Sequence, residues 1–112
     1  MIRHKLSGVG AAMITPFTAD GRIDYEALAS TVDYVIEGGA DYIVALGTTA
    51  ETPPLYMPER AVIAMFISNH IAGRVPLVIG VGGNSTSEVL DQLREFDLRR
   101  ADAILSLSLI HI

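Results

Sequence analysis

Six consecutive residues, Gly47–Thr52, have the side chains best suited to chemistry. They follow an apolar stretch and combine a glycine, the adjacent hydroxyls of Thr48 and Thr49, and the carboxylate of Glu51. Consecutive backbone N–H groups and hydroxyls can hold a small carboxylate or phosphate. Thr48 and Glu51 also fit a capping box, which satisfies the first N–H groups of a helix. The residues alone allow both interpretations, an anion site and a helix cap.

A second glycine-rich segment, Gly80–Asn84, departs from the dinucleotide-binding pattern that it suggests. The third glycine of G-x-G-x-x-G would stand at position 85, which is Ser85. The acidic residue that the pattern requires about 20 residues later is also missing from a strand end, because Asp102 only opens the next apolar stretch. We therefore expect a tight turn here and no nucleotide cofactor.

The composition excludes several classes of protein. The chain has 112 residues, 50% of them apolar and 19% charged, which is one globular domain at most. Its net charge of −5 argues against nucleic-acid and membrane partners. The absence of cysteine excludes a disulfide scaffold, and the three histidines lack metal-ligand spacing. We expect a cytoplasmic chain that binds no metal and no cofactor. His70 lies near the expected C-terminus of a helix, where a favourable interaction with the helix dipole explains the presence of a histidine.

Three cycles of an apolar stretch, a turn and an amphipathic helix predict a parallel α/β sheet. The expected strands are 8–15, 41–46, 77–80 and 103–106, and the helices between them reach about residues 37, 72 and 99. The carboxyl ends of parallel strands share one edge, where ligands bind. The sequence therefore brings together three loops, 16–23, 47–57 and 81–85.

Residues at the ends of these helices set the expected boundaries. Asp24 is the expected N-cap of the first helix, and Gly38–Gly39 should end it. Pro58 suits the first position of the second helix. Ser85 and Glu88 form a capping-box pattern for the third helix.

Five short motifs, in order and at characteristic spacing, carry a resemblance to a known family. They are Thr15-Pro16-Phe17, Asp20-Gly21-x-Ile23-Asp24, Gly47-Thr48-Thr49-Ala50-Glu51, Val78–Gly82 and Asn84–Glu88. From about Gly8 to Ser106 the chain resembles the N-terminal part of the dihydrodipicolinate synthases. These are pyruvate-dependent lyases and aldolases, a family that includes N-acetylneuraminate lyase.

The resemblance implies a (β/α)8 TIM barrel, of which this chain would form about three and a half β–α units. It also implies that a lysine late in the longer protein forms a Schiff base with pyruvate, whose enamine then adds to aspartate semialdehyde. The imine acts as an electron sink that makes the pyruvate methyl group acidic. The implied assembly of the parent protein is a dimer or tetramer.

The resemblance assigns roles to single residues of this chain. Thr48 matches the threonine of a proton relay that includes two tyrosines, and Thr49 matches the residue that binds the pyruvate carboxylate. Ala50 stands where most members have glycine. Two threonines favour the synthase branch, because neuraminate lyases more often have Gly-Ser-Thr at these positions.

A candidate allosteric site for lysine is also implied by the resemblance. Asn84 and Glu88 match two polar positions of a dimer-interface pocket that binds lysine in some members. Met57 and Arg60 stand where lysine-sensitive bacterial enzymes can have histidines, which puts lysine sensitivity in doubt.

Two other functions fit the same residues. One keeps the family and changes the substrate, giving an N-acetylneuraminate lyase or a 2-keto-3-deoxy sugar acid aldolase. The other is a small, doubly wound, non-enzymatic module that binds an anion through residues 47–52.

The last residues differ from the family pattern. A Pro-Tyr-Tyr segment is expected where the chain has Leu109, Ile110 and His111. The hexapeptide 107–112 is also the translation of a transposon end used in preparing sequencing libraries. We therefore expect 1–106 to be a partial TIM-barrel domain and 107–112 a non-native, adapter-derived tail. The one lysine, Lys5, cannot replace the Schiff-base lysine, so we expect an inactive, molten or aggregating fragment.

Overall fold

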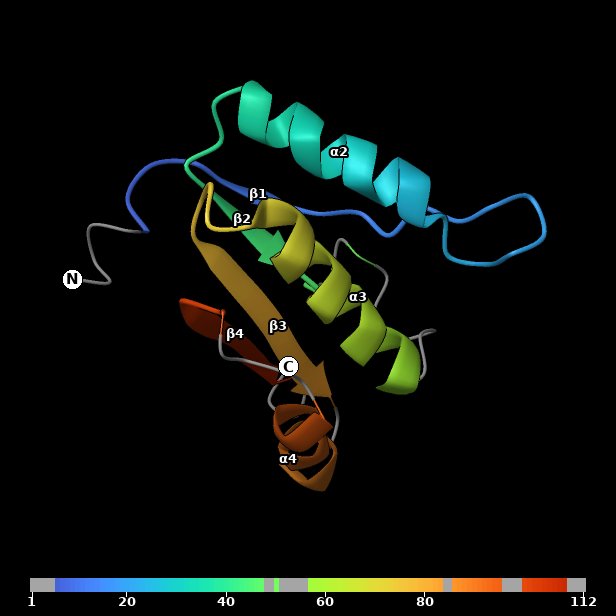
Figure 1. The fold of residues 1–112 in the computed structure, drawn as a ribbon. Coiled ribbons are helices and arrows are strands. Elements are labelled where there is room, and N and C mark those ends of the chain that lie inside the picture. Colours follow the sequence, from blue (N-terminus) through green and yellow to red (C-terminus); the bar gives the residue numbers. More distant parts are fainter. Residues whose placement is uncertain (1–5, 48–49, 51–56, 84–85, 96–99, 109–112) are drawn as a thin grey trace.

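Strands and helices alternate along the chain in the computed structural model, which describes residues 6–47, 50, 57–83, 86–95 and 100–108 (Figure 1). The elements are β1 (Gly10–Ala12), α2 (Tyr25–Glu37), β2 (Tyr42–Ala45), α3 (Met57–Ile71), β3 (Leu77–Gly83), α4 (Thr86–Glu95) and β4 (Ala103–Ser108). None of the helices in this part of the chain is long and apolar enough to cross a membrane.

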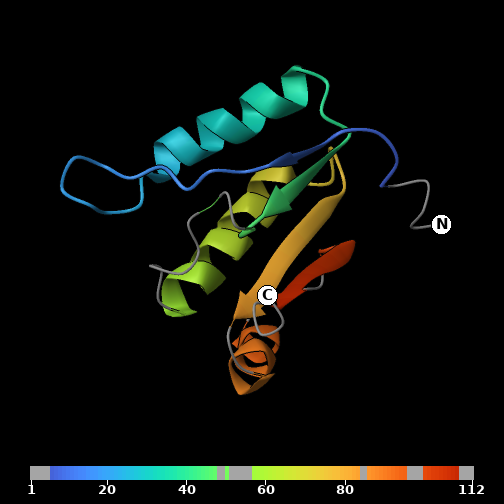
Figure 2. The same cartoon turned by 180° about the vertical axis from the view of Figure 1, so that it is seen from behind.

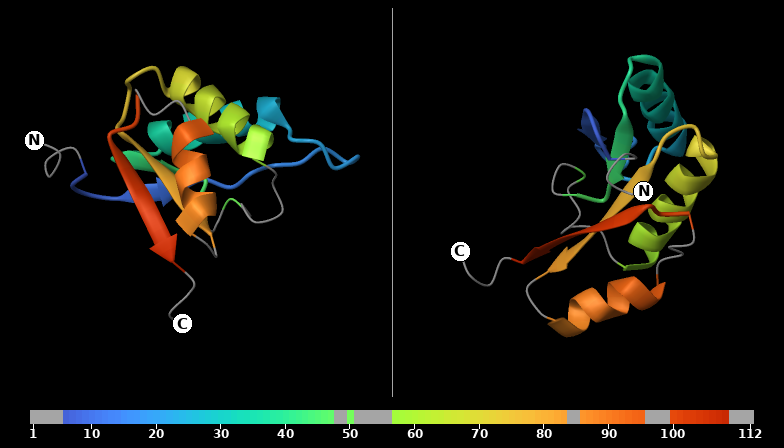
Figure 3. Two further views of the ribbon diagram at one scale, coloured as in Figure 1. Left: turned by 90° about the horizontal axis from the view of Figure 1, so that it is seen from below. Right: turned by 90° about the vertical axis from the view of Figure 1, so that its left-hand side faces the viewer.

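The four strands form one parallel sheet in the order β1-β2-β3-β4. Each connection moves one strand further in the same direction, so right-handed crossovers place all the helices on one face. Helix α3 lies in front of the strands in Figure 1 and behind them in Figure 2. The turned views of Figure 3 show α2, α3 and α4 on the same side of the sheet. A strand order that advances in one direction is typical of a barrel. In a doubly wound sheet the strand order reverses at one point, and the order of the described strands does not.

The boundaries of α2 follow the predicted caps, whereas the predicted capping box of Ser85 and Glu88 lies outside the described residues. The Asp24 carboxylate accepts a hydrogen bond of 2.9 Å from the Ala27 N–H, as an N-cap should. After α2, the Ala40 N–H donates to the Val35 carbonyl, and Gly39 adopts a φ of +97° that glycine tolerates best. Helix α3 begins one residue before Pro58. Helix α4 begins directly after position 85, and the predicted extension over 96–99 lies outside the described residues.

The strand lengths differ from the prediction in both directions. Strand β1 covers three residues rather than the expected 8–15, although the Met13 N–H still donates to the Val44 carbonyl at 2.9 Å. Strand β3 continues to Gly83, so the tight turn expected from Gly80 onward is wrong. The extension is stabilised by β4, which also runs past Ser106 and pairs with β3 as far as Ser108.

The core lies between the helices and one face of the sheet. Ile43, Ala45 and Ile79 point from the strands into this layer and are fully buried. Buried side chains of α2 and α3 meet them there, namely Leu28, Val32, Ile63, Ala64, Ile67 and Ile71. The opposite face of the sheet is less covered: Ile14 is 49% exposed and Leu105 48% exposed.

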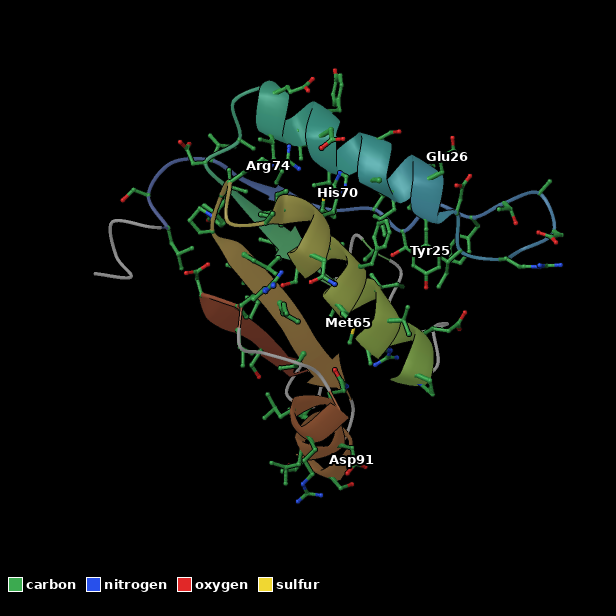
Figure 4. All side chains as sticks on the ribbon, viewed as in Figure 1. Tyr25, Glu26, Met65, His70, Arg74 and Asp91 are labelled. Carbon is green, nitrogen blue, oxygen red and sulfur yellow. The ribbon has the colours of Figure 1, made fainter. Side chains whose placement is uncertain are left out.

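A polar cluster connects the end of α3 to α2. The Asp33 Oδ1 atom lies 2.9 Å from both His70 Nε2 and Arg74 Nη2 (Figure 4 labels the two basic residues). Arg74 also donates to the carbonyls of His70 and Ile71, near the end of the helix. The hydrogen bond from Arg74, and then that from His70, lower the pKa of Asp33 below its usual value. His70 was expected to interact with the helix dipole; the structure adds a hydrogen bond to the Asp33 carboxylate.

We predict that Asp33→Asn will flatten the dependence of stability on pH in the acid range. A carboxyl group whose pKa is lower in the folded state stabilises the fold above its unfolded pKa, and this contribution is lost as the pH falls through the folded pKa. Urea unfolding followed by circular dichroism between about pH 2 and pH 5 would measure the slope.

The matched variant is Arg74→Gln, which removes the first cause of the lowered pKa of Asp33. It should flatten the same acid slope and add little in the Asp33→Asn background. An acid slope equal to that of the parent chain in both single variants would contradict the prediction.

Candidate active site

The carboxyl ends of β1, β2 and β3 lie at one edge of the sheet, as expected for parallel strands (Figure 1). Three residues assigned to this edge, Thr48, Thr49 and Asn84, lie outside the described residues, so their assigned roles stay predictions. Glu88 lies in the first turn of α4, and its side chain is likewise outside the description.

The backbone turns sharply where β2 ends. Leu46 is 3% exposed and has a φ of +59°, in the left-handed region that costs a non-glycine residue about 1–2 kcal/mol. The Ala50 N–H then donates to the Gly47 carbonyl at 3.0 Å, and the Ala50 side chain is also buried. Two buried residues, Leu46 and Ala50, therefore flank Thr48 and Thr49 in the sequence. Strain of this kind persists only where the surrounding structure imposes it, and it is common at functional sites.

Gly80 on β3 leaves the space that this turn occupies. A Cβ atom at Gly80 would overlap the Leu46 carbonyl oxygen and lie 2.8 Å from the carbonyl carbon and 3.0 Å from the Gly47 nitrogen. Only a glycine lets the β2 backbone approach β3 so closely. The sequence pattern singled out Gly80 correctly as a special position, but the reason is close packing within a strand rather than a turn.

We predict that Gly80→Ala will lower the free energy of unfolding by roughly 1–3 kcal/mol, as other overpacked sites do. The matched control is Gly47→Ala in the same turn. Its added Cβ would meet its nearest atom, Val44 Cγ1, at 3.7 Å, which is an ordinary contact. The control should change the free energy by less than about 0.5 kcal/mol in the same urea titration. Equal effects of the two substitutions would contradict the proposed contact.

Gln92 on α4 holds the end of β3 from the other side. Its side chain is fully buried, its Nε2 donates to the Gly82 carbonyl at 2.7 Å, and its Oε1 accepts from the Gly82 N–H at 3.2 Å. Strand β2 ends opposite Ile79, so it cannot supply these partners. The Leu77 carbonyl accepts a hydrogen bond from the Asp102 N–H and therefore points toward β4. Successive residues of a strand direct their backbone N–H and C=O groups to opposite sides, so those of Gly82 point to the side where β2 has already ended. The side-chain amide takes the place of the missing strand.

Gln92 was not predicted from the sequence, although a signal was present. It lies three residues after Val89 on the apolar side of α4, where a polar side chain must find a partner. Asp33 and Arg74 were missed as well, and their separation of 41 positions leaves no local pattern to find.

Two other features of the described residues bear on where a site can lie. Within the described ranges, no three side chains of His, Cys, Asp or Glu gather where they could hold a metal ion. A cavity of about 600 Å³ lies at the opposite end of the sheet, beside the end of α3 and the start of β3, and is lined in part by Arg74, Arg100 and Asp102. In barrels of this kind, the amino ends of the strands serve stability and the carboxyl ends serve catalysis.

Comparison with known proteins gives the same family for almost the whole chain. The model of the dihydrodipicolinate synthetase family matches residues 5–108. The 4-hydroxy-tetrahydrodipicolinate synthase of Parabacteroides distasonis is 48% identical over 101 residues, which are 90% of this chain and 34% of that protein. The synthase of Porphyromonas gingivalis is 44% identical over 108 residues, 96% of this chain and 36% of that protein.

Solved structures share the fold. The synthase from Methylacidiphilum fumariolicum SolV superposes with a TM-score of 0.85 at 33% identity, covering 93% of this chain and 34% of that one. YagE, an Escherichia coli K12 prophage protein of the same family in complex with pyruvate, superposes with a TM-score of 0.83 at 34% identity, covering 90% and 34%. The chain therefore spans about a third of these relatives and forms the N-terminal part of their TIM barrel. It belongs to the dihydrodipicolinate synthetase family.

Proposed function

We propose that this chain is the N-terminal part of a 4-hydroxy-tetrahydrodipicolinate synthase, a lyase that condenses pyruvate with aspartate semialdehyde in the diaminopimelate route to lysine. The observation that carries the proposal is the 44–48% identity to relatives of that name over 101–108 residues. The pyruvate in the YagE structure supports the first substrate for the family. The pair Thr48-Thr49 supports the synthase branch.

In the proposed reaction, a lysine amine attacks the keto carbon of pyruvate and water leaves, giving an imine. Loss of a methyl proton forms an enamine, whose carbon attacks the aldehyde of the second substrate. Thr49 would hold the pyruvate carboxylate, and Thr48 would pass protons within the relay. Their placement would depend on the turn that Leu46 and Gly80 impose, since a catalytic group must be held close to its productive geometry.

The chain by itself is proposed to be inactive, because its one lysine is Lys5, before the first strand. The parent protein would form a dimer or tetramer. Asn84 and Glu88 are proposed to contribute to a lysine-binding pocket of the parent. Arg60, which is 7% exposed in α3, is proposed to stand where lysine-sensitive enzymes can have a histidine, and this argues against lysine sensitivity of the parent.

Borohydride trapping tests the proposal. We predict that the longer protein, incubated with pyruvate and sodium borohydride, will gain the mass of a reduced pyruvate adduct on a strand lysine, while the 112-residue chain gains none. In the longer protein, Thr49→Val should raise the KM for pyruvate, and Thr48→Val should lower kcat more than it changes KM. No adduct on the longer protein would sink the enzyme proposal, and turnover of a sugar acid in place of aspartate semialdehyde would move it to the aldolase branch.

We also propose that residues 107–112 are a non-native tail. The support is the match of this hexapeptide to a transposon end, whereas strand β4 itself crosses the boundary after Ser106. The gene sequence beyond codon 106 decides the matter: continuation into Pro-Tyr-Tyr supports the tail, and a natural stop after Ile112 rejects it.

A further inference from the structure

The cavity at the amino end of the sheet lies away from the candidate active site. It is lined by the last turn of α3, by the loop that leads from Gly73 into β3, and by Arg100 and Asp102 just before β4. Its volume of about 600 Å³ falls within the range of small-molecule pockets, about 300–1,000 Å³. The cavity is therefore large enough for a small organic molecule.

Arg74 is fixed on this lining by the end of α3 (Figure 4 labels Arg74). Its Nε donates to the Ile71 carbonyl at 3.1 Å. Its Nη2 donates to the His70 carbonyl and to the Asp33 carboxylate, each at 2.9 Å. These bonds use the N–H groups of Nε and Nη2, so those of Nη1 have no partner among the described residues.

Arg100 brings a second guanidinium group to the same cavity. Its Nη1 donates to Asn69 Oδ1 at 2.9 Å, which ties it to the same end of α3 that holds Arg74. Within the part of the chain that the structure describes, this is the one hydrogen bond of the Arg100 side chain, and its other N–H groups remain available. Both guanidinium groups are thus positioned in advance and keep donors for a ligand.

The charges around the cavity favour an anion, although the chain as a whole has a net charge of −5. Among the described lining residues, Asp102 is the one acid, and its Oδ2 accepts from the Leu77 N–H at 3.0 Å. Asp33 contacts Arg74 only at Nη2. Two guanidinium groups on one cavity repel each other, and an anion shared by both relieves that repulsion. Arginine suits phosphate in particular, because its planar fork can donate two hydrogen bonds at once.

The backbone after α3 adds a further donor. Ala72 and Gly73 are consecutive residues with left-handed φ values of +49° and +79°. The Gly73 N–H has no acceptor in the described ranges, and a Cβ atom added at Gly73 would meet nothing within 4 Å. An alanine in this conformation is strained, and such strain is common where a protein holds a ligand. A backbone N–H that faces open space in such a turn can bind an anion.

We infer that this cavity binds a small phosphate monoester. The phosphate oxygens accept hydrogen bonds from Arg74, Arg100 and the Gly73 N–H. The organic part lies on the apolar part of the lining, which includes Val75 and Pro76. The site uses neither pyruvate nor the carboxyl edge of the sheet, so it does not depend on the proposed function.

Isothermal titration calorimetry of the longer protein in a chloride buffer tests the inference, with inorganic phosphate and phenyl phosphate as the probes. The active site is first blocked with pyruvate and borohydride; if no adduct forms there, the untreated protein is titrated and the test stands unchanged. We expect saturable binding of both probes. Phenyl phosphate should bind at least about tenfold more tightly, because its ring covers apolar lining. Equal affinities of the two probes would reject the monoester.

Arg100→Gln should weaken both probes at least about tenfold, since it removes charged donors to the phosphate. Arg74→Gln should do the same, and its circular dichroism must first match that of the parent protein because Arg74 also holds the end of α3. The matched control is Arg94→Gln on α4, an exposed arginine that pairs with Asp91 at 3.4 Å. This control should keep the parent affinity. No saturable binding, an unchanged affinity in Arg100→Gln, or an equal loss in Arg94→Gln would overturn the inference.

Discussion

The close approach of the β2 backbone to Gly80 decides the geometry of the carboxyl edge. Two backbone segments meet there without a side chain between them, and Leu46 at this contact has an unfavourable φ of +59°. The opposing free energies are of similar size: about 1–2 kcal/mol for the left-handed leucine, against more than 1.5 kcal/mol for burying its side chain. The turn is therefore held by tertiary packing and would not form in an isolated peptide of this sequence.

The direction of winding has an equally wide effect. Because every crossover advances in the same sense, the helices bury Ile43, Ala45 and Ile79 completely, whereas Ile14 and Leu105 on the opposite face of the sheet stay about half exposed. A sheet with this order cannot cover both of its faces with its own helices. In a closed barrel of this family, further strands cover this second face of the sheet.

Local signals predicted much of this fold. Asp24 and Gly38–Gly39 fixed both ends of α2 because caps act through hydrogen bonds to nearby backbone. The extent of β3 could not be read locally, since Val81–Gly83 become strand only when β4 supplies a partner. The same limit applies at the site: glycine and threonine types marked the edge, whereas the φ of Leu46 results from contact with a strand more than 30 positions away.

The Gln92 carboxamide has a consequence for intermolecular contacts. Past the end of β2, strand β3 would present the bare N–H and C=O of Gly82, which any passing extended segment could pair with. By occupying both groups, Gln92 blocks the insertion of a foreign strand at that point. Incoming strands are thereby directed to the outer sides of β1 and β4, the two places where additional strands extend this sheet in register.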